Sequence, residues 1–194
     1  MTALTSLCVY CGSSSGLDRS HRDAAARLGR LMAERGVRLV FGGGNIGLMG
    51  ALAQAALDAG GRVTGVIPRH LADREVAHPD VTELIVVDSM HERKLRMFQL
   101  ADAFAVLAGG LGTLDETFEI ITWRQLGLHD KPIVLVDCAG YWAPLLRLLD
   151  HVAASGFADA GASRLFTVVE RVDDVFAAID AAAPPATSPR DGLL

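Results

Sequence analysis

Short apolar runs alternate with longer amphipathic stretches along most of this chain. The short runs predict β-strands and the longer stretches, with apolar residues about one helical turn apart, predict α-helices. The predicted strands are Leu4–Tyr10, Arg38–Phe41, Val63–Ile67, Glu83–Val87, Ala103–Leu107, Ile133–Val136 and Leu165–Val169. The predicted helices cover residues 18–35, 46–59, 89–100, 113–126, 141–154 and 172–182.

Several of the predicted strands are unbroken apolar runs, such as PIVLV at residues 132–136. An unbroken run is typical of a parallel strand that is covered by helices on both faces of its sheet. Strands and helices that alternate through short connections imply right-handed crossovers. The pattern therefore predicts one α/β domain over residues 1–182, a Rossmann-like, doubly wound parallel sheet flanked by helices. The segment AAAPPATSPRDGLL predicts a flexible tail over residues 183–194.

Composition excludes several classes of function. The net charge of −5 argues against a nucleic-acid partner. No apolar stretch reaches the roughly 18 residues that span a bilayer, and no basic segment precedes the first apolar run, so we expect a cytoplasmic protein without a membrane partner.

Reactive residue types are sparse. Cys8 and Cys11 form a C-x-x-C pair, but Cys8 falls within a predicted buried strand and Cys138 stands alone, so we interpret the thiols as structural. The six histidines form no metal-binding array, and we expect neither a metal nor an organic cofactor. Lys94 and Lys131 are the only lysines, which makes a pyridoxal-phosphate enzyme a poor interpretation.

Three predicted strands end in segments rich in glycine and hydroxyl residues. These segments are CGSSSG (residues 11–16), GGGNIGLMG (42–50) and AGGLGT (108–113). Ligands of open α/β sheets bind beyond the carboxyl ends of the strands, where all three segments should meet. We therefore expect the ligand site there, with Ser13 and Ser14 as additional hydroxyl donors.

The segment GGGNIG (42–47) matches the dinucleotide fingerprint G-x-G-x-x-G, which needs an acidic residue at the end of the next strand. The next strand ends in Ile67-Pro68-Arg69 instead, which disfavours NAD and leaves only NADP, held by Arg69. The alternative is a tight turn that lets the following helix pack closely on the sheet, for which Gly47 and Gly50 are suited.

The segment AGGLGT precedes a predicted helix, so its unhindered amides and the positive end of the helix favour a small anion such as a monophosphate. No G-K-[ST] follows, which disfavours ATP hydrolysis. Glu116 has two interpretations. It completes a capping box with Thr113, or it is a catalytic carboxylate beside the group that carries the phosphate. The neighbouring carboxylates Asp115 and Glu119 are poorer candidates for catalysis, although Glu119 lies one turn on, where it would support Glu116.

The segment SMHERK (89–94) places Arg93 and Lys94 near the start of a predicted helix, where the helix dipole repels positive charge. A misplaced charge of this kind indicates an anionic partner. The simpler interpretation is a solvated helix face, which local sequence alone favours.

Taken together, CGSSSG, GGGNIGLMG, IPRHL, MHERK and AGGLGTLDE resemble, in this order, the LONELY GUY family, over about residues 5–180. Members are cytokinin riboside 5′-monophosphate phosphoribohydrolases, often mislabelled as lysine decarboxylases. The resemblance implies a homodimer that hydrolyses the N-glycosidic bond of an adenine-type nucleoside monophosphate. It also implies that Arg93 and Glu116 are catalytic. The substrate-binding positions that we expect are Ser14, Gly44, Glu75, Met90, Lys94, Gly109, Gly110, Leu111, Gly112, Thr113 and Thr122.

The chain departs from the family motif at Ala108, where the motif has proline. Proline would fix φ near −65°, so alanine is expected to leave the loop less rigid, at a cost of about 0.4–1 kcal/mol. An apolar pocket beside the base would need liners such as Met90, Met97 and either Leu48 or Met49. Two further hypotheses stay open: a carrier that binds a nucleotide or the molybdenum cofactor without turnover, and an NADP oxidoreductase.

Overall fold

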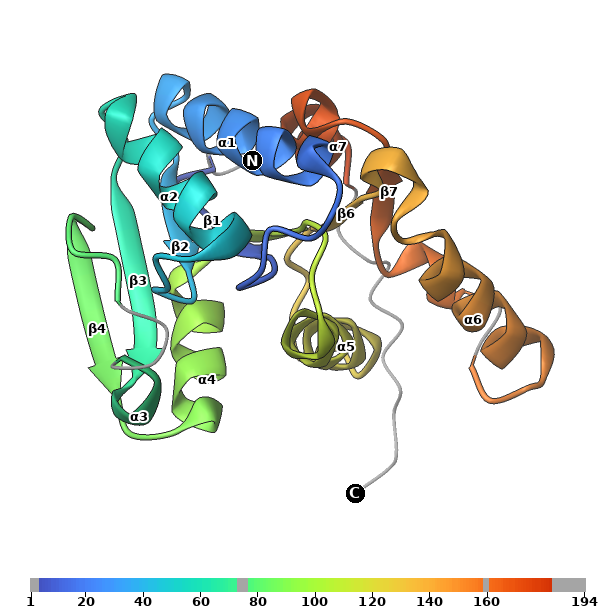
Figure 1. Cartoon of the computed structure of the whole chain (residues 1–194). Helices are drawn as coiled ribbons and strands as arrows, with labels where there is room; N and C mark the ends of the chain where they lie inside the picture. Colours follow the sequence, from blue (N-terminus) through green and yellow to red (C-terminus); the bar gives the residue numbers. More distant parts are fainter. Residues whose placement is uncertain (1–3, 73–76, 159–160, 183–194) are drawn as a thin grey trace.

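The computed structural model describes residues 4–72, 77–158 and 161–182, and its central element is a single parallel sheet of seven strands (Figure 1). The strand order is β4-β3-β2-β1-β5-β6-β7, and every neighbouring pair is parallel. The strands are β1 Ser6–Tyr10, β2 Arg38–Phe41, β3 Val63–Pro68, β4 Glu83–Val87, β5 Ala103–Val106, β6 Ile133–Val136 and β7 Thr167–Val169. The predicted doubly wound α/β fold is confirmed.

Helices follow the strands as the alternation predicted. They are α1 Arg19–Glu34, α2 Gly47–Asp58, α3 Arg69–Ala72, α4 Met90–Leu100, α5 Leu111–Gln125, α6 Ala143–Ala154 and α7 Val175–Ala181. Three short 3₁₀ turns, Cys138–Gly140, Ala162–Arg164 and Val172–Asp174, complete the described elements. The predicted tail, residues 183–194, lies outside the described part of the chain.

Alternate side chains of β1 enter two separate cores, one on each face of the sheet. Leu7 and Val9 pack with residues of α1, α2 and α7, whereas Cys8 and Tyr10 pack with residues of α4, α5 and α6. The two helix groups lie on opposite sides of the sheet in Figure 1. Both faces are therefore buried over the central strands, which explains why their sequences are unbroken apolar runs, whereas the edge strands β4 and β7 are partly exposed.

Element ends differ from the predictions by a few residues. The first strand begins at Ser6 instead of Leu4, and the last begins at Thr167 instead of Leu165. The helix expected from residue 113 begins at Leu111, because Gly110 is its N-cap. Helix α3 was not predicted, since four polar and apolar residues after Pro68 are too few to show a helical period.

The strand order reverses at β1, because β1 pairs with β2 on one side and with β5 on the other. The chain leaves β1 toward β2, β3 and β4, and then returns to place β5 against the free side of β1. The connections that follow β1 and β5 consequently diverge, and a crevice opens beyond the carboxyl ends of these two strands. The topology thus puts the glycine segments 11–16 and 108–113 at the same crevice.

Beyond the far end of α5, His129 is held in a neutral form. One ring nitrogen, Nε2, lies 2.8 Å from the carbonyl oxygen of Ile120, and the other, Nδ1, accepts the Lys131 amide at 3.1 Å. Burial lowers the pKa of His129 below its usual value of 6.5, and the charges of Arg124 and Lys131 lower it further. An added proton on Nδ1 would break the Lys131 contact.

We therefore expect stability to fall in mild acid through His129. Because its folded pKa is lowered, its contribution is complete above about pH 6.5 and is lost as the pH falls through the folded value. Urea unfolding at pH 7.5 and 5.0 measures the loss, and His129→Gln should reduce the difference between the two pH values. An equal difference in the variant would contradict this assignment.

Candidate functional site

Gly12, just after β1, joins the three glycine segments at the carboxyl edge of the sheet. Its amide donates to the Ala108 carbonyl at 3.0 Å, which ties the β1 segment to the β5 segment. Its carbonyl accepts the amides of Leu48 and Met49 at 3.0 and 3.3 Å, which ties both to the start of α2. The expectation that the three segments meet is confirmed.

Glycine is required where these segments touch. A Cβ on Gly109 would lie 2.1 Å from the Thr113 hydroxyl oxygen and 2.9 Å from the Gly12 nitrogen. Gly47 has a φ of +64°, and a Cβ there would lie 2.3 Å from the Ser13 carbonyl carbon. Gly50 approaches the Asn45 carbonyl in the same way. The GGGNIG segment is thus a tight turn before α2, as the packing interpretation predicted.

A hollow of about 620 Å³, counting its open mouth, lies at the crevice between β1 and β5. Its wall combines the ends of β1 and β2 with the first turns of α4 and α5. The lining residues are Val9, Tyr10, Cys11, Gly12, Ser13, Gly42, Met49, Met90, Arg93, Met97, Gly110, Leu111, Gly112, Thr113 and Glu116. Arg93 and Glu116, which are 23 positions apart in the sequence, therefore face the same space.

Arg93 is only 6 % exposed, and its guanidinium is anchored by main-chain oxygens. Its Nε donates to the Val66 carbonyl at 3.2 Å, and its Nη2 donates to the Gly42 carbonyl at 3.1 Å. A Cβ at residue 42 would lie 1.9 Å from Nη2, so the first glycine of the GGG run makes room for the cation. These bonds fix the plane of the guanidinium at the wall of the hollow.

Glu116 is 8 % exposed and belongs to the second turn of α5. The capping-box interpretation is wrong, because the helix begins at Leu111 with Gly110 as N-cap, and Thr113 is already the third helical residue. The Thr113 carbonyl accepts the Thr117 hydroxyl at 2.6 Å, as in a helix interior. Glu116 therefore lines the hollow for a reason other than capping.

The first turn of α5 has no side-chain cap. Its N-cap is a glycine without a side chain, so no side-chain oxygen occupies the first amides of the helix. Gly110, Leu111, Gly112 and Thr113 all line the hollow. Unfilled amides and the positive end of a 15-residue helix together favour a negatively charged group at this end of the hollow.

Comparisons with known proteins identify the family of this chain. A family model described as "Possible lysine decarboxylase" matches residues 49–179. Cytokinin riboside 5′-monophosphate phosphoribohydrolase LOG of Oryza sativa subsp. japonica is 48 % identical over 159 residues, which are 82 % of this chain and 66 % of the relative. LOG3 of Arabidopsis thaliana is 42 % identical over 92 % of this chain and 83 % of its own length. The chain belongs to the LOG family.

Solved structures support the fold of this LOG family member. The Moco carrier protein of Chlamydomonas reinhardtii has a TM-score of 0.71 at 22 % identity, and the match covers 93 % of this chain and 98 % of that protein. The molybdenum cofactor binding protein of Rippkaea orientalis gives a TM-score of 0.69 at 21 % identity, with the same coverage. At such identities the likeness describes the fold alone.

The interpretation of Arg93 and Lys94 as part of a solvated helix face is wrong, because both side chains are buried. Lys94 is 8 % exposed, and its Nζ lies 3.0 Å from Glu119 and 3.1 Å from Asp115 of α5. Burial lowers the pKa of Lys94, but the hydrogen bonds and charges of Glu119 and Asp115 outweigh burial and leave the pKa above its usual value. The ion pairs tie α4 to α5 beside the hollow.

Some of the predicted substrate residues do not line the hollow in this chain. Ser14 is exposed and accepts the Gly16 amide at 3.3 Å, and its neighbour Ser13 lines the wall instead. Gly44 forms a bridge to Ala77, and Gly109 lies behind Gly110. Thr122 is exposed toward the far end of α5. Glu75 lies outside the described residues.

Methionines form the apolar part of the wall. Met90 lines the hollow as predicted, with Met49 and Met97 beside it. Leu48, the alternative to Met49, is instead buried in the core under α2. The sequence analysis missed Gly42, whose position as the first residue of the GGG run was the available signal.

Two of the thiols, Cys8 and Cys11, are buried, and the third, Cys138, is partly buried. Cys8 packs in one core and Cys11 in the other, so they do not form a redox pair. Burial raises the pKa of both thiols, and the charge of Glu116 raises it further. In the described part of the chain, no three His, Cys, Asp or Glu side chains are grouped closely enough to hold a metal ion. No helix there is long and apolar enough to cross a membrane.

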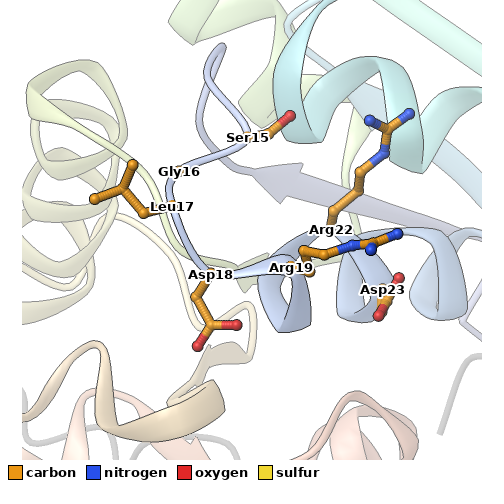
Figure 2. A pocket seen from close by; sticks show the side chains of 7 residues that line it. All are labelled: Ser15, Gly16, Leu17, Asp18, Arg19, Arg22 and Asp23. Atoms are coloured by element: carbon orange, nitrogen blue, oxygen red, sulfur yellow. The ribbon is translucent and has the colours of Figure 1, made fainter.

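A second hollow of about 550 Å³ lies beside the segment 15–23, which leads into α1 (Figure 2). Leu17 projects away from Arg22, and Asp18 points to the other side of the segment from Arg19 (Figure 2). These side chains do not converge on a common point. The first hollow, where Arg93 and Glu116 meet the start of α5, is therefore the candidate site.

We expect the Lys94 ion pairs to hold the site together. Lys94→Met keeps the length of the side chain and leaves the two carboxylates close to each other, which should cost about 1–2 kcal/mol because the pair is only partly buried. Urea unfolding measures this loss. Arg69→Met is the control, because Arg69 and Asp88 are 3.9 Å apart and largely exposed, so it should change stability little. Equal effects in both variants would contradict the structural role of Lys94.

Proposed function

We propose that this chain hydrolyses the N-glycosidic bond of cytokinin riboside 5′-monophosphates and of AMP, releasing the free base and ribose 5-phosphate. The observation that carries the proposal is one hollow that holds Glu116, Arg93 and the uncapped start of α5. The names of relatives that are 42–48 % identical support the same activity.

Cleavage of a ribosyl C–N bond generates positive charge on the anomeric carbon and the ring oxygen, by analogy with glycoside hydrolysis. The Glu116 carboxylate stabilises that charge and accepts a proton from the attacking water. Water supplies the hydroxyl group that becomes the anomeric hydroxyl of ribose 5-phosphate. The electron pair of the broken bond leaves with the purine, which takes up a proton.

Arg93 orients the reacting sugar. The Val66 and Gly42 carbonyls accept two of the five N–H donors of its guanidinium. The other terminal nitrogen, Nη1, lies on the side of the methionines, 3.8 Å from the Met90 sulfur. A guanidinium that is already anchored loses little freedom when its remaining donors bind ribose hydroxyls.

The start of α5 binds the 5′-phosphate. The amides of Gly110 to Thr113 and the helix dipole face the negative group, while Glu116 lies one turn further along the same helix. A helix is stiff, so the phosphate site and the carboxylate keep a fixed spacing. Binding of the phosphate then places the anomeric carbon against Glu116.

The base lies against the methionine wall. Met49, Met90 and Met97 are flexible and polarizable, and favourable contacts between sulfur and aromatic rings suit a purine. The same wall accepts an apolar substituent on the adenine, such as a prenyl group.

The homodimer that the family resemblance implies has support in an exposed apolar face of α5. Leu111 is 85 % exposed, and Phe118 follows seven residues later on the same face. Thr122 lies on this face too, one turn beyond Phe118, and the exposed Leu126 follows the helix. A second copy of the chain would cover these side chains.

The test of the proposed function measures adenine release from three substrates: AMP, isopentenyladenosine 5′-monophosphate and adenosine. We expect turnover of both monophosphates, and a kcat/KM at least about 100-fold lower for adenosine because it lacks the group that α5 binds. Binding of both monophosphates without release of any base would contradict the hydrolase and favour a nucleotide carrier.

Glu116→Gln should abolish most turnover while the fold stays intact. Loss of the negative charge removes both stabilisation of the sugar cation and the proton acceptor, so we expect kcat to fall about 10²–10⁴-fold. Steady-state kinetics on AMP measures this change, and thermal melting checks the fold. Glu34→Gln on α1 is the control, because Glu34 lies outside the hollow and should leave kcat unchanged. A Glu116→Gln variant with unchanged kcat would exclude Glu116 from catalysis.

A further inference from the structure

Tyr141 contacts the phosphate-binding segment from a distant part of the chain. Its hydroxyl donates to the Gly109 carbonyl oxygen at 2.6 Å, across 32 positions of sequence. Tyr141 follows the short turn Cys138–Gly140 after β6, on the far side of β5 from β1. It does not line the hollow itself, so it acts on the site only through Gly109.

The turn that presents Tyr141 has an unusual backbone. Ala139 has φ +56° and ψ +26°, the only left-handed non-glycine residue among those described, and Gly140 follows with φ +72°. A side chain in this region costs energy, and such strain persists only where surrounding contacts impose it. The neighbouring contacts are firm, because the Trp142 amide donates to Asp137 and the Trp142 ring is buried.

Aromatic contacts fix the ring of Tyr141 on two sides. The ring of His21 lies 5.2 Å away at an angle of 75°, and the ring of Trp142 lies 4.8 Å away at 82°. Both are edge-on arrangements, which are favourable for aromatic pairs. The direction of the hydroxyl group is therefore determined before any ligand binds.

The bond to Gly109 determines the direction of the next amide. In a planar trans peptide the carbonyl of Gly109 and the N–H of Gly110 point in opposite directions. Because the carbonyl points at Tyr141, the N–H of Gly110 points away from it, and Gly110 lines the hollow. No atom lies within 4 Å of where a Cβ on Gly110 would be, so the space beside this residue is open.

We propose that Tyr141 is a positioning residue that orients the Gly110 amide toward the 5′-phosphate of the substrate. The inference rests on the proposed function, because it takes the phosphate to sit at the start of α5. Residue 108 is alanine, so the segment lacks the stiffness that proline would give it. The Tyr141 hydroxyl supplies that stiffness through its hydrogen bond to Gly109.

The experiment compares Tyr141→Phe with the unmodified protein. The variant keeps the aromatic contacts and removes only the hydroxyl. We expect the KM for AMP and the Kd for ribose 5-phosphate, measured by calorimetry, to rise about three- to tenfold. The kcat/KM for adenosine, which has no phosphate, should stay unchanged, and so should the melting temperature.

The control is Thr5→Val, which removes a hydroxyl that donates to Asp102 at 2.7 Å. This bond lies at the amino ends of β1 and β5, away from the hollow, so the KM for AMP and the Kd for ribose 5-phosphate should not change. In the Tyr141→Phe background, Ala108→Pro should recover part of the lost affinity. Unchanged affinity in Tyr141→Phe, an equal loss with adenosine, or no recovery with proline would each overturn the proposal. If the unmodified protein releases no base from AMP, the proposed function fails, whereas calorimetry with ribose 5-phosphate still tests Tyr141.

Discussion

The site depends on how closely three main-chain segments approach one another at the carboxyl edge of the sheet. Gly12 bonds the Ala108 carbonyl and the first amides of α2, and Gly109 lies so near Thr113 and Gly12 that no side chain fits between them. The glycines therefore serve packing first. Their contact brings the start of α5 beside the end of β1, and both line the hollow.

Two cations of α4 are then placed in different ways, although they are adjacent in sequence. Arg93 turns toward the carbonyls at the ends of β2 and β3, while Lys94 turns toward the carboxylates of α5. Because consecutive helical residues differ by about 100°, one helix contacts both the sheet and its neighbour. Burial of each cation is offset by oxygens around it, so α4 is fixed in rotation and Arg93 keeps its place opposite α5.

The sequence predicted the sheet well because the central strands are apolar runs that are buried on both faces. The motifs drew attention to Arg93 and Glu116, which do line one hollow, but they did not predict that both side chains are buried. The predicted start of α5 was wrong because a glycine N-cap has no recognisable sequence pattern. Thr113 and Glu116, by contrast, have the spacing of a capping box. Tyr141 was missed for a different reason. Its contact joins turns that are 32 residues apart, and no local pattern reports a bond of that kind.

The fold by itself does not decide between binding and hydrolysis, since molybdenum cofactor carriers share it at 21–22 % sequence identity. Function depends on the residues of the site and not on the fold that carries them. Hydrolysis additionally needs a carboxylate beside the sugar that carries the phosphate. Glu116 lies at the wall of the hollow, in a helix whose N-cap is a glycine six residues earlier. Under the proposed function, this position lets the carboxylate face the positive charge that develops on the sugar.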